Sequence, residues 1–95
     1  MALYILVCND KPDSLPLRMA TREAHLAYVR EQIGQVKLAG PLSDAKGEMA
    51  GSFFILDVAD IEAARAFNAA DPYAKAGLFG QVQVTAFKAT VGSLG

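Results

Sequence analysis

The side chain best suited to proton transfer is that of the single histidine, His25. Imidazole gains and loses a proton near neutral pH, which makes it the usual general acid or base. Arg18 and Arg22 precede it by seven and three residues, so in a helix all three share roughly one face. A lone helical histidine is also common as a structural or solvent-exposed residue, and both interpretations stay open.

Asp71 is the candidate partner of His25. In two antiparallel helices on one face of a sheet, the end of the second lies near the beginning of the first, which permits an Asp71–His25 contact. A carboxylate on one imidazole nitrogen fixes the tautomer and leaves the other nitrogen to accept a substrate proton. Asp71-Pro72 is also a standard helix start, in which the aspartate caps the following turn. The two roles are compatible.

Other residues give weaker signals. Arg22 could hold a carboxylate or phenolate, or could pair with Glu23 or Asp71. The single cysteine, Cys8, lies in an apolar run and is interpreted as a small hydrophobic residue. One cysteine and one histidine cannot build a His/Cys metal cluster. The serines, Ser52 among them, lack a nucleophile elbow, and the glycines match no dinucleotide or phosphate loop. We expect neither a metal nor a cofactor.

Composition narrows the class of protein. The 95 residues, 53% of them hydrophobic, predict one domain over residues 1–95 with a real core. A net charge of −1 offers no polycationic field to nucleic acids or anionic lipids. The longest apolar run, residues 3–8, is far shorter than the roughly 20 residues that span a bilayer. We therefore expect a cytoplasmic protein without nucleic-acid or membrane partners.

The apolar patterning predicts the element order β-α-β-β-α-β, which is typical of a ferredoxin-like fold. Strands are expected at residues 3–8, 36–39, 52–58 and 82–86, and helices at about 17–33, 61–70 and 74–77. The first and third strands are apolar on both faces, as central strands are, whereas the second and fourth alternate with polar residues. The predicted class is α+β, a four-stranded antiparallel sheet with two helices on one face.

Two local details accompany this pattern. The first helix is expected to carry a stripe at helical spacing, formed by Arg22, Leu26, Val29 and Ile33. In the second strand, Val36 and Leu38 are expected on one side and Lys37 on the other, with Gly40-Pro41 breaking or bending the strand.

The second face of the predicted sheet needs a cover. Two helices can cover only one face, and the other would expose an unusually large apolar patch. We therefore expect a homodimer that packs sheet against sheet. The alternative is that the C-terminal tail, residues 90–95, folds over this face.

Several motifs together resemble those of the YciI-like (YCII-related) proteins. They are RMATREAHL at residues 18–26, LAGPL at 38–42, DPY at 71–73, AGL at 76–78 and FK at 87–88. They follow in order over essentially the whole chain, and their combination is specific. One difference is Ala86, where relatives often have proline.

The resemblance implies a ferredoxin-like subunit, a dimer of the dimeric α+β barrel kind, and a site built on a histidine–aspartate pair that maps onto His25 and Asp71. Muconolactone isomerase shares the architecture, and a dehydrochlorinase of chlorinated hydroquinones is among the relatives. The chain is thus expected to be a cofactor-independent isomerase or dehydrohalogenase-like lyase acting on a small cyclic or aromatic metabolite. Arg22 and Tyr73 would hold substrate oxygen atoms.

Two other classes of function stay open. In a non-catalytic metabolite-binding or regulatory homodimer, His25 and Asp71 would hold a ligand that is never consumed. A structural interaction module would have no cleft near His25.

Overall fold

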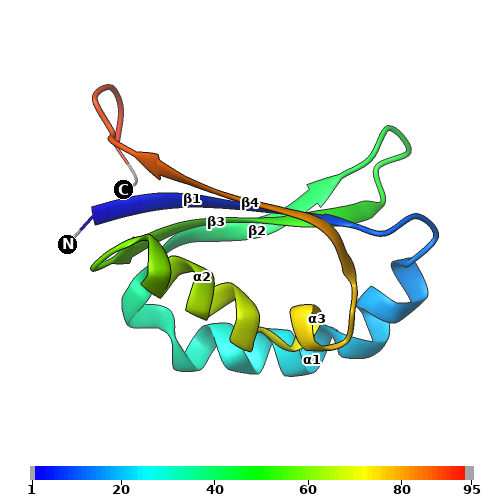
Figure 1. Cartoon of the computed structure of the whole chain (residues 1–95). Coiled ribbons are helices and arrows are strands. Elements are labelled where there is room, and N and C mark those ends of the chain that lie inside the picture. Colours follow the sequence, from blue (N-terminus) through cyan, green and yellow to red (C-terminus); the bar gives the residue numbers. More distant parts are fainter. Residues whose placement is uncertain (1, 94–95) are drawn as a thin grey trace.

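A four-stranded antiparallel sheet forms one layer of the molecule, and the helices form the other (Figure 1). The computed structural model describes residues 2–93. The strands are β1 (Ala2–Asp10), β2 (Val36–Ser43), β3 (Met49–Val58) and β4 (Phe79–Phe87). The helices are α1 (Leu15–Glu31), α2 (Ile61–Ala70) and the short α3 (Pro72–Lys75), with a 3-10 turn η1 at Ile33–Gln35. The order β2-β3-β1-β4 confirms that the first and third strands are central.

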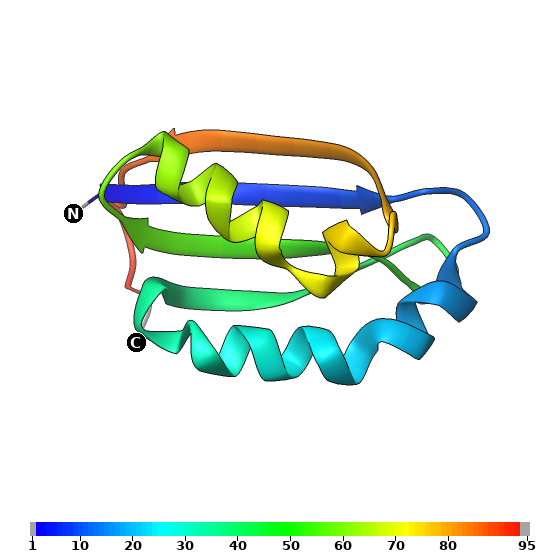
Figure 2. The same cartoon turned by 60° about the horizontal axis from the view of Figure 1, so that its bottom comes forward.

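The helices lie on one face of this sheet. Figure 2 shows α1 along the β2 side and α2 running antiparallel to it across β1 and β3, so that the end of α2 reaches the first half of α1. Beneath the helices lies a core formed by Leu6, Cys8, Phe54, Leu56, Val58, Ala64 and Phe67. Within residues 2–93, no helix is both long enough and apolar enough to cross a bilayer.

The inward face of α1 differs from the predicted stripe. The buried residues of this helix are Arg18 and His25, whereas Arg22 is exposed and Ile33 is 62% exposed beyond the end of the helix. Leu26 and Val29 of the predicted stripe do face inward, since both line a cavity and Val29 packs on the core. The polar residues beside them are buried because each has a partner in another element. The Tyr28 hydroxyl, for example, donates to a backbone carbonyl of α2 at 2.7 Å. A search for apolar periodicity could not detect such a face.

The prediction for β2 is wrong about which side chains share a face. A register shift separates Val36, which pairs with Leu56 and packs on the helix-side core, from Leu38, which pairs with Ile55. One extra residue in the ladder reverses the direction of the following side chains, so Val36 and Leu38 face opposite sides. Of the two expectations for Gly40-Pro41, the break is overturned: the strand continues to Ser43, because an edge strand tolerates a residue without a backbone N–H.

The second face of the sheet, opposite the helices, carries no helix of the described residues (Figure 1). On it lie Ile5 and Ile55, which are paired across the two central strands, and the edge residue Leu38, which is 48% exposed. Residues 90–93 of the tail are exposed, with Val91 93% exposed, and lie at the end of β4 (Figure 1). The last two residues of the predicted tail lie outside the described part of the chain.

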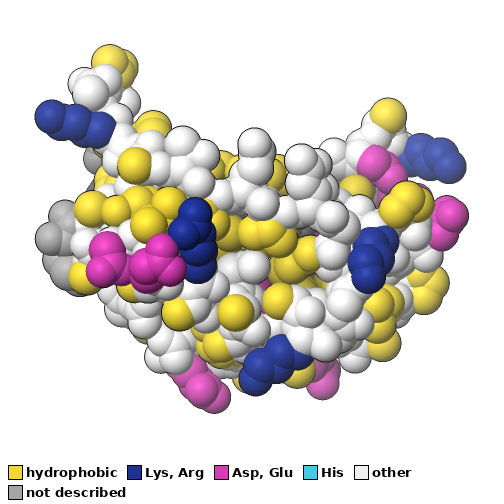
Figure 3. Space-filling view, viewed as in Figure 1, with side chains coloured by type: hydrophobic (Ala, Val, Ile, Leu, Met, Phe, Trp, Pro, Cys, Tyr) yellow, Lys and Arg dark blue, Asp and Glu magenta, His cyan; other side chains and the backbone are white. Residues whose placement is uncertain are grey.

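Figure 3 views the molecule edge-on and shows charged side chains of both signs scattered over it.

Gly51 of β3 leaves no room for a side chain against β1. A Cβ atom there would lie 2.6 Å from the backbone oxygen of Cys8, whereas one at Gly40 in β2 would meet nothing within 4 Å. We expect Gly51→Ala to lower the free energy of unfolding by about 1–3 kcal/mol, as overpacking does. Urea denaturation of both alanine variants measures this, with Gly40→Ala as the control. Equal stabilities of the two variants would contradict the clash.

Cys8 is fully buried, and its thiol donates to Asn68 Oδ1 at 3.4 Å. Burial, reinforced by the carboxylates of Asp71 and Asp10, raises the pKa of Cys8 to about 12. The reactive thiolate is therefore scarce at pH 8. We expect the native protein to resist a thiol-specific disulfide reagent at this pH and the urea-unfolded chain to react at once. The absorbance of the thiolate that the reagent releases measures the reaction. Rapid labelling of the native protein would contradict the burial and the raised pKa of Cys8.

Candidate active site

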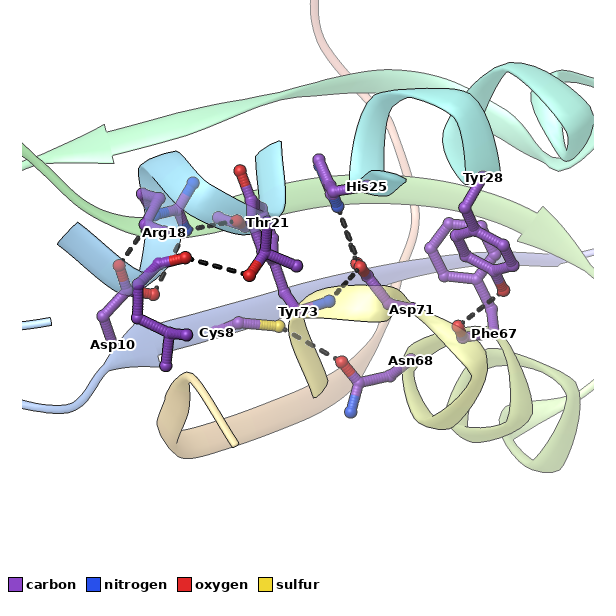
Figure 4. A network of polar contacts seen from close by, with 12 residues as sticks. Cys8, Asp10, Arg18, Thr21, His25, Tyr28, Phe67, Asn68, Asp71 and Tyr73 are labelled. Carbon is purple, nitrogen blue, oxygen red and sulfur yellow. Dashed lines mark hydrogen bonds and ion pairs between the residues drawn. The ribbon is translucent and has the colours of Figure 1, made fainter. Parts of the chain in front are cut away.

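The structure brings His25 and Asp71 together, although 46 positions separate them in sequence. His25 lies midway along α1, and Asp71 lies where α2 ends and α3 begins. The imidazole Nδ1 lies 2.9 and 3.0 Å from the two carboxylate oxygens (Figure 4). A carboxylate can only accept, so Nδ1 carries the proton and donates a hydrogen bond to Asp71. The other nitrogen, Nε2, is left to exchange protons.

The carboxylate of Asp71 is also held by a backbone hydrogen bond. Its Oδ1 also accepts from the backbone N–H of Tyr73 at 2.9 Å, which caps α3. The residue is only 1% exposed, so both of its interactions take place away from bulk water. Both interpretations of Asp71 therefore hold geometrically: it caps a helical turn and it binds the histidine.

Tyr73 joins this pair to a second ionic group. Its ring stacks on the imidazole of His25 with centroids 4.0 Å apart and planes at 17°. The guanidinium carbon of Arg18 lies 4.5 Å from the centre of the same ring. Burial raises the pKa of Tyr73, and the positive charges of Arg18 and Arg22 only partly oppose this effect. The phenol is therefore neutral at physiological pH.

Arg18 belongs to a buried network that the sequence did not predict. Its Nε donates to Asp10 Oδ2 at 2.7 Å, and its Nη2 donates to Asp10 Oδ1 at 3.1 Å and to Ser52 Oγ at 2.7 Å. Arg18 is 2% exposed and Ser52 is 3% exposed. The available signal was an aspartate two residues beyond the predicted first strand, at the last residue of β1, and an arginine on the same helix face as His25. Neither residue type is usual in a core.

A cavity of about 160 Å³ adjoins these groups. Its polar wall consists of Arg18, Arg22, His25, Ser52 and Tyr73, and its apolar wall includes Leu26, Val29, Pro41, Met49 and Phe54. An apolar cavity of about 150 Å³ accommodates benzene, so this space suits a single six-membered ring. A cleft beside His25 contradicts the interpretation as a purely structural module.

The four predicted site residues occupy different positions around this cavity. His25, Arg22 and Tyr73 line it, whereas Asp71 lies behind the imidazole. Arg22 is exposed, and none of the ion pairs seen among residues 2–93 involves its guanidinium. In the same part of the chain, no group of three or more His, Cys, Asp or Glu side chains is arranged to hold a metal ion.

Comparison with known proteins places the chain among relatives of the same length. A model of the YCII-related domain matches residues 2–88. Protein YciI of Escherichia coli O6:H1 is 38% identical, and the alignment covers 90% of this chain and 96% of that protein. An uncharacterized protein of Haemophilus influenzae is 33% identical, with 90% and 95% covered.

Solved structures agree with this relationship. The dehydrochlorinase of 5-chloro-2-hydroxyhydroquinone (TftG) from Burkholderia phenoliruptrix, in complex with 2,5-dihydroxybenzoquinone, has a TM-score of 0.85 and 32% identity, covering 90% of this chain and 93% of its own. An antibiotic biosynthesis monooxygenase, at 16% identity and a TM-score of 0.57, shares the fold alone. From its domain match and its full-length relatives, the chain belongs to the YCII-related family.

Proposed function

We propose that the protein is a small enzyme that needs no cofactor and transfers a proton on a single-ring metabolite, with His25 as general acid or base. The observation that carries this proposal is the histidine itself, held at Nδ1 by a buried carboxylate on the wall of a ring-sized cavity. A base positioned in this way contributes about 10²–10⁴-fold to the rate of a proton transfer.

In the proposed reaction, Nε2 of His25 carries the proton and Asp71 supports the imidazole through Nδ1. Nε2 takes a proton from a hydroxyl of the ring, and the carboxylate of Asp71 stabilises the imidazolium that results. If the imidazolium returns this proton to a ring carbon, the O–H electron pair forms a C=O bond, a ring C=C pair binds the proton, and the reaction is an isomerisation to the keto form. Where the protonated carbon also carries the halogen, Nε2 then takes the proton of a second hydroxyl. That O–H pair forms another C=O bond, the adjacent C=C pair shifts towards the halogenated carbon, and the halide leaves with its own electron pair, so that the net reaction is loss of hydrogen halide.

The similarity to the dehydrochlorinase favours loss of hydrogen halide over isomerisation. Loss of hydrogen chloride from a ring needs a proton acceptor and a place for the ring, and this chain offers both. At 32% identity over 90% of the chain, 5-chloro-2-hydroxyhydroquinone is a reasonable first compound to test. Arg22 and Tyr73 on the cavity wall are the proposed contacts for its oxygen atoms.

Chloride release from 5-chloro-2-hydroxyhydroquinone, assayed without oxygen, tests the proposal. We expect His25→Ala to lower turnover by about 10²–10⁴-fold, the contribution of a general base. We expect Asp71→Asn to lower turnover as well, because the amide oxygen can still cap α3 but supplies no negative charge. Circular dichroism and thermal melting show whether both variants fold. A His25→Ala variant as active as the original protein removes the histidine from the mechanism, and a compound that is bound but never consumed favours the metabolite-binding alternative.

We also propose that two copies pack through the open face of the sheet. Ile5 and Leu38 present apolar surface there beside Ile55, which is 6% exposed, and the described residues of the tail are themselves exposed. A contiguous apolar patch on a sheet face is typical of an interface. Self-association of identical faces gives a closed, two-fold dimer.

Light scattering coupled to size-exclusion chromatography measures this assembly. We expect twice the mass of the chain for the unchanged protein and a shift toward the monomer for Leu38→Glu, because the substitution places a charge in the interface. Ile33→Glu is the matched control, since Ile33 is 62% exposed at the end of the helical layer and lies outside the proposed interface. A monomeric original protein, or equal effects of the two substitutions, would rule out this interface.

A further inference from the structure

We infer that Ser52 is a second functional group of the cavity: its hydroxyl donates a hydrogen bond to a hydroxyl or keto oxygen on the bound ring. This inference rests on the proposed function, because it assigns the substrate class of the same cavity. It identifies a ring compound with an oxygen substituent at the Ser52 end and a transferable proton within reach of His25.

The position of Ser52 is unusual for a serine. It lies on the central strand β3, one side of which is otherwise filled by the core residues Phe54, Leu56 and Val58. Its strand neighbours are Cys8 and Pro41, and it is 3% exposed. The same residue forms part of the cavity wall. A hydroxyl in a core position that adjoins a cavity is available to whatever enters the cavity.

The hydrogen bond from Arg18 determines what the hydroxyl can do. Ser52 Oγ accepts from the Arg18 guanidinium at 2.7 Å, so its own proton is free to be donated elsewhere. Among the hydrogen bonds seen within residues 2–93, none has the Ser52 hydroxyl as donor. Hydrogen bonds in a chain polarise one another, which makes a hydroxyl that accepts from a cation a stronger donor.

Arg18 is held in place by the same network. Asp10 binds it through two hydrogen bonds and balances its charge, and Tyr73 lies against its guanidinium. The positive charge of Arg18 is therefore already matched before a ligand arrives. At Ser52, which Arg18 contacts, a neutral oxygen acceptor fits better than a permanent carboxylate does.

This donor would also act during the proposed reaction. When Nε2 of His25 takes a proton from a ring hydroxyl, negative charge develops on the ring oxygens conjugated with the reacting carbon. A fixed donor at that oxygen stabilises the charge, and removal of one such donor from an enzyme costs about 10²–10³-fold in turnover. Asp10 and Arg18 are positioning residues in this scheme, because they act through Ser52.

Binding of two matched rings tests the inference without any turnover. The probes are 4-fluorophenol and 4-fluorotoluene, which differ by a hydroxyl in place of a methyl group and are both observed by fluorine NMR. We expect the unchanged protein to prefer the phenol. We expect Ser52→Ala to lose about tenfold in affinity for the phenol alone, the effect of one hydrogen bond to a polarised group. Ser52→Thr keeps the hydroxyl and should keep the preference.

The outcomes separate this inference from the acid–base proposal. If the phenol instead donates to His25, then His25→Ala rather than Ser52→Ala abolishes the preference, and the role of Ser52 is overturned. Equal affinity of the two rings for the unchanged protein, or no measurable binding of either, also overturns it. If His25→Ala stays active in the chloride assay while Ser52→Ala still loses the phenol preference, only the acid–base proposal fails.

Discussion

Two buried carboxylates, Asp10 and Asp71, impose the constraint on which the rest of the site depends. Asp71 is 1% exposed, and the side chain of Asp10 is 4% exposed. A carboxylate away from water is tolerated only with a hydrogen-bonded partner, and loss of one partner of a buried pair costs about 3–5 kcal/mol. Arg18 and His25, two turns apart on α1, supply these partners. Compensation of buried charge thus allows Arg18 and His25 to face inward on α1, a helix whose Tyr28 and Val29 also pack against the core.

The short turn from Asp71 to Tyr73 links the stability of the fold to the geometry of the site. The carboxylate of Asp71 caps α3 and holds His25, while the ring of Tyr73 lies against both His25 and Arg18. The groups on the cavity wall are therefore oriented by folding, before any ligand binds. In a flexible site, ordering these groups around the substrate would cost entropy during the reaction. Here folding has already placed them.

The apolar pattern was sufficient to predict the sheet, because β1 and β3 are buried on both faces and must be central. It was also possible to place Asp71 near His25 from the antiparallel helices. The pattern could not reveal the register shift after Val36, which depends on backbone pairing. Nor could it reveal the Asp10–Arg18–Ser52 network, because periodicity analysis counts apolar residues and these polar side chains are buried through mutual hydrogen bonds.

The proline in β2 affects how the molecule can aggregate. Pro41 lies in an edge strand and is paired with Ser52, and it has no N–H to offer on either side. A foreign strand that docked along this edge would meet a gap in the hydrogen-bond ladder, which discourages open-ended, amyloid-like growth. Pro41 also forms part of the cavity wall, so the residue that protects this border of the sheet helps to shape the place where a ring would bind.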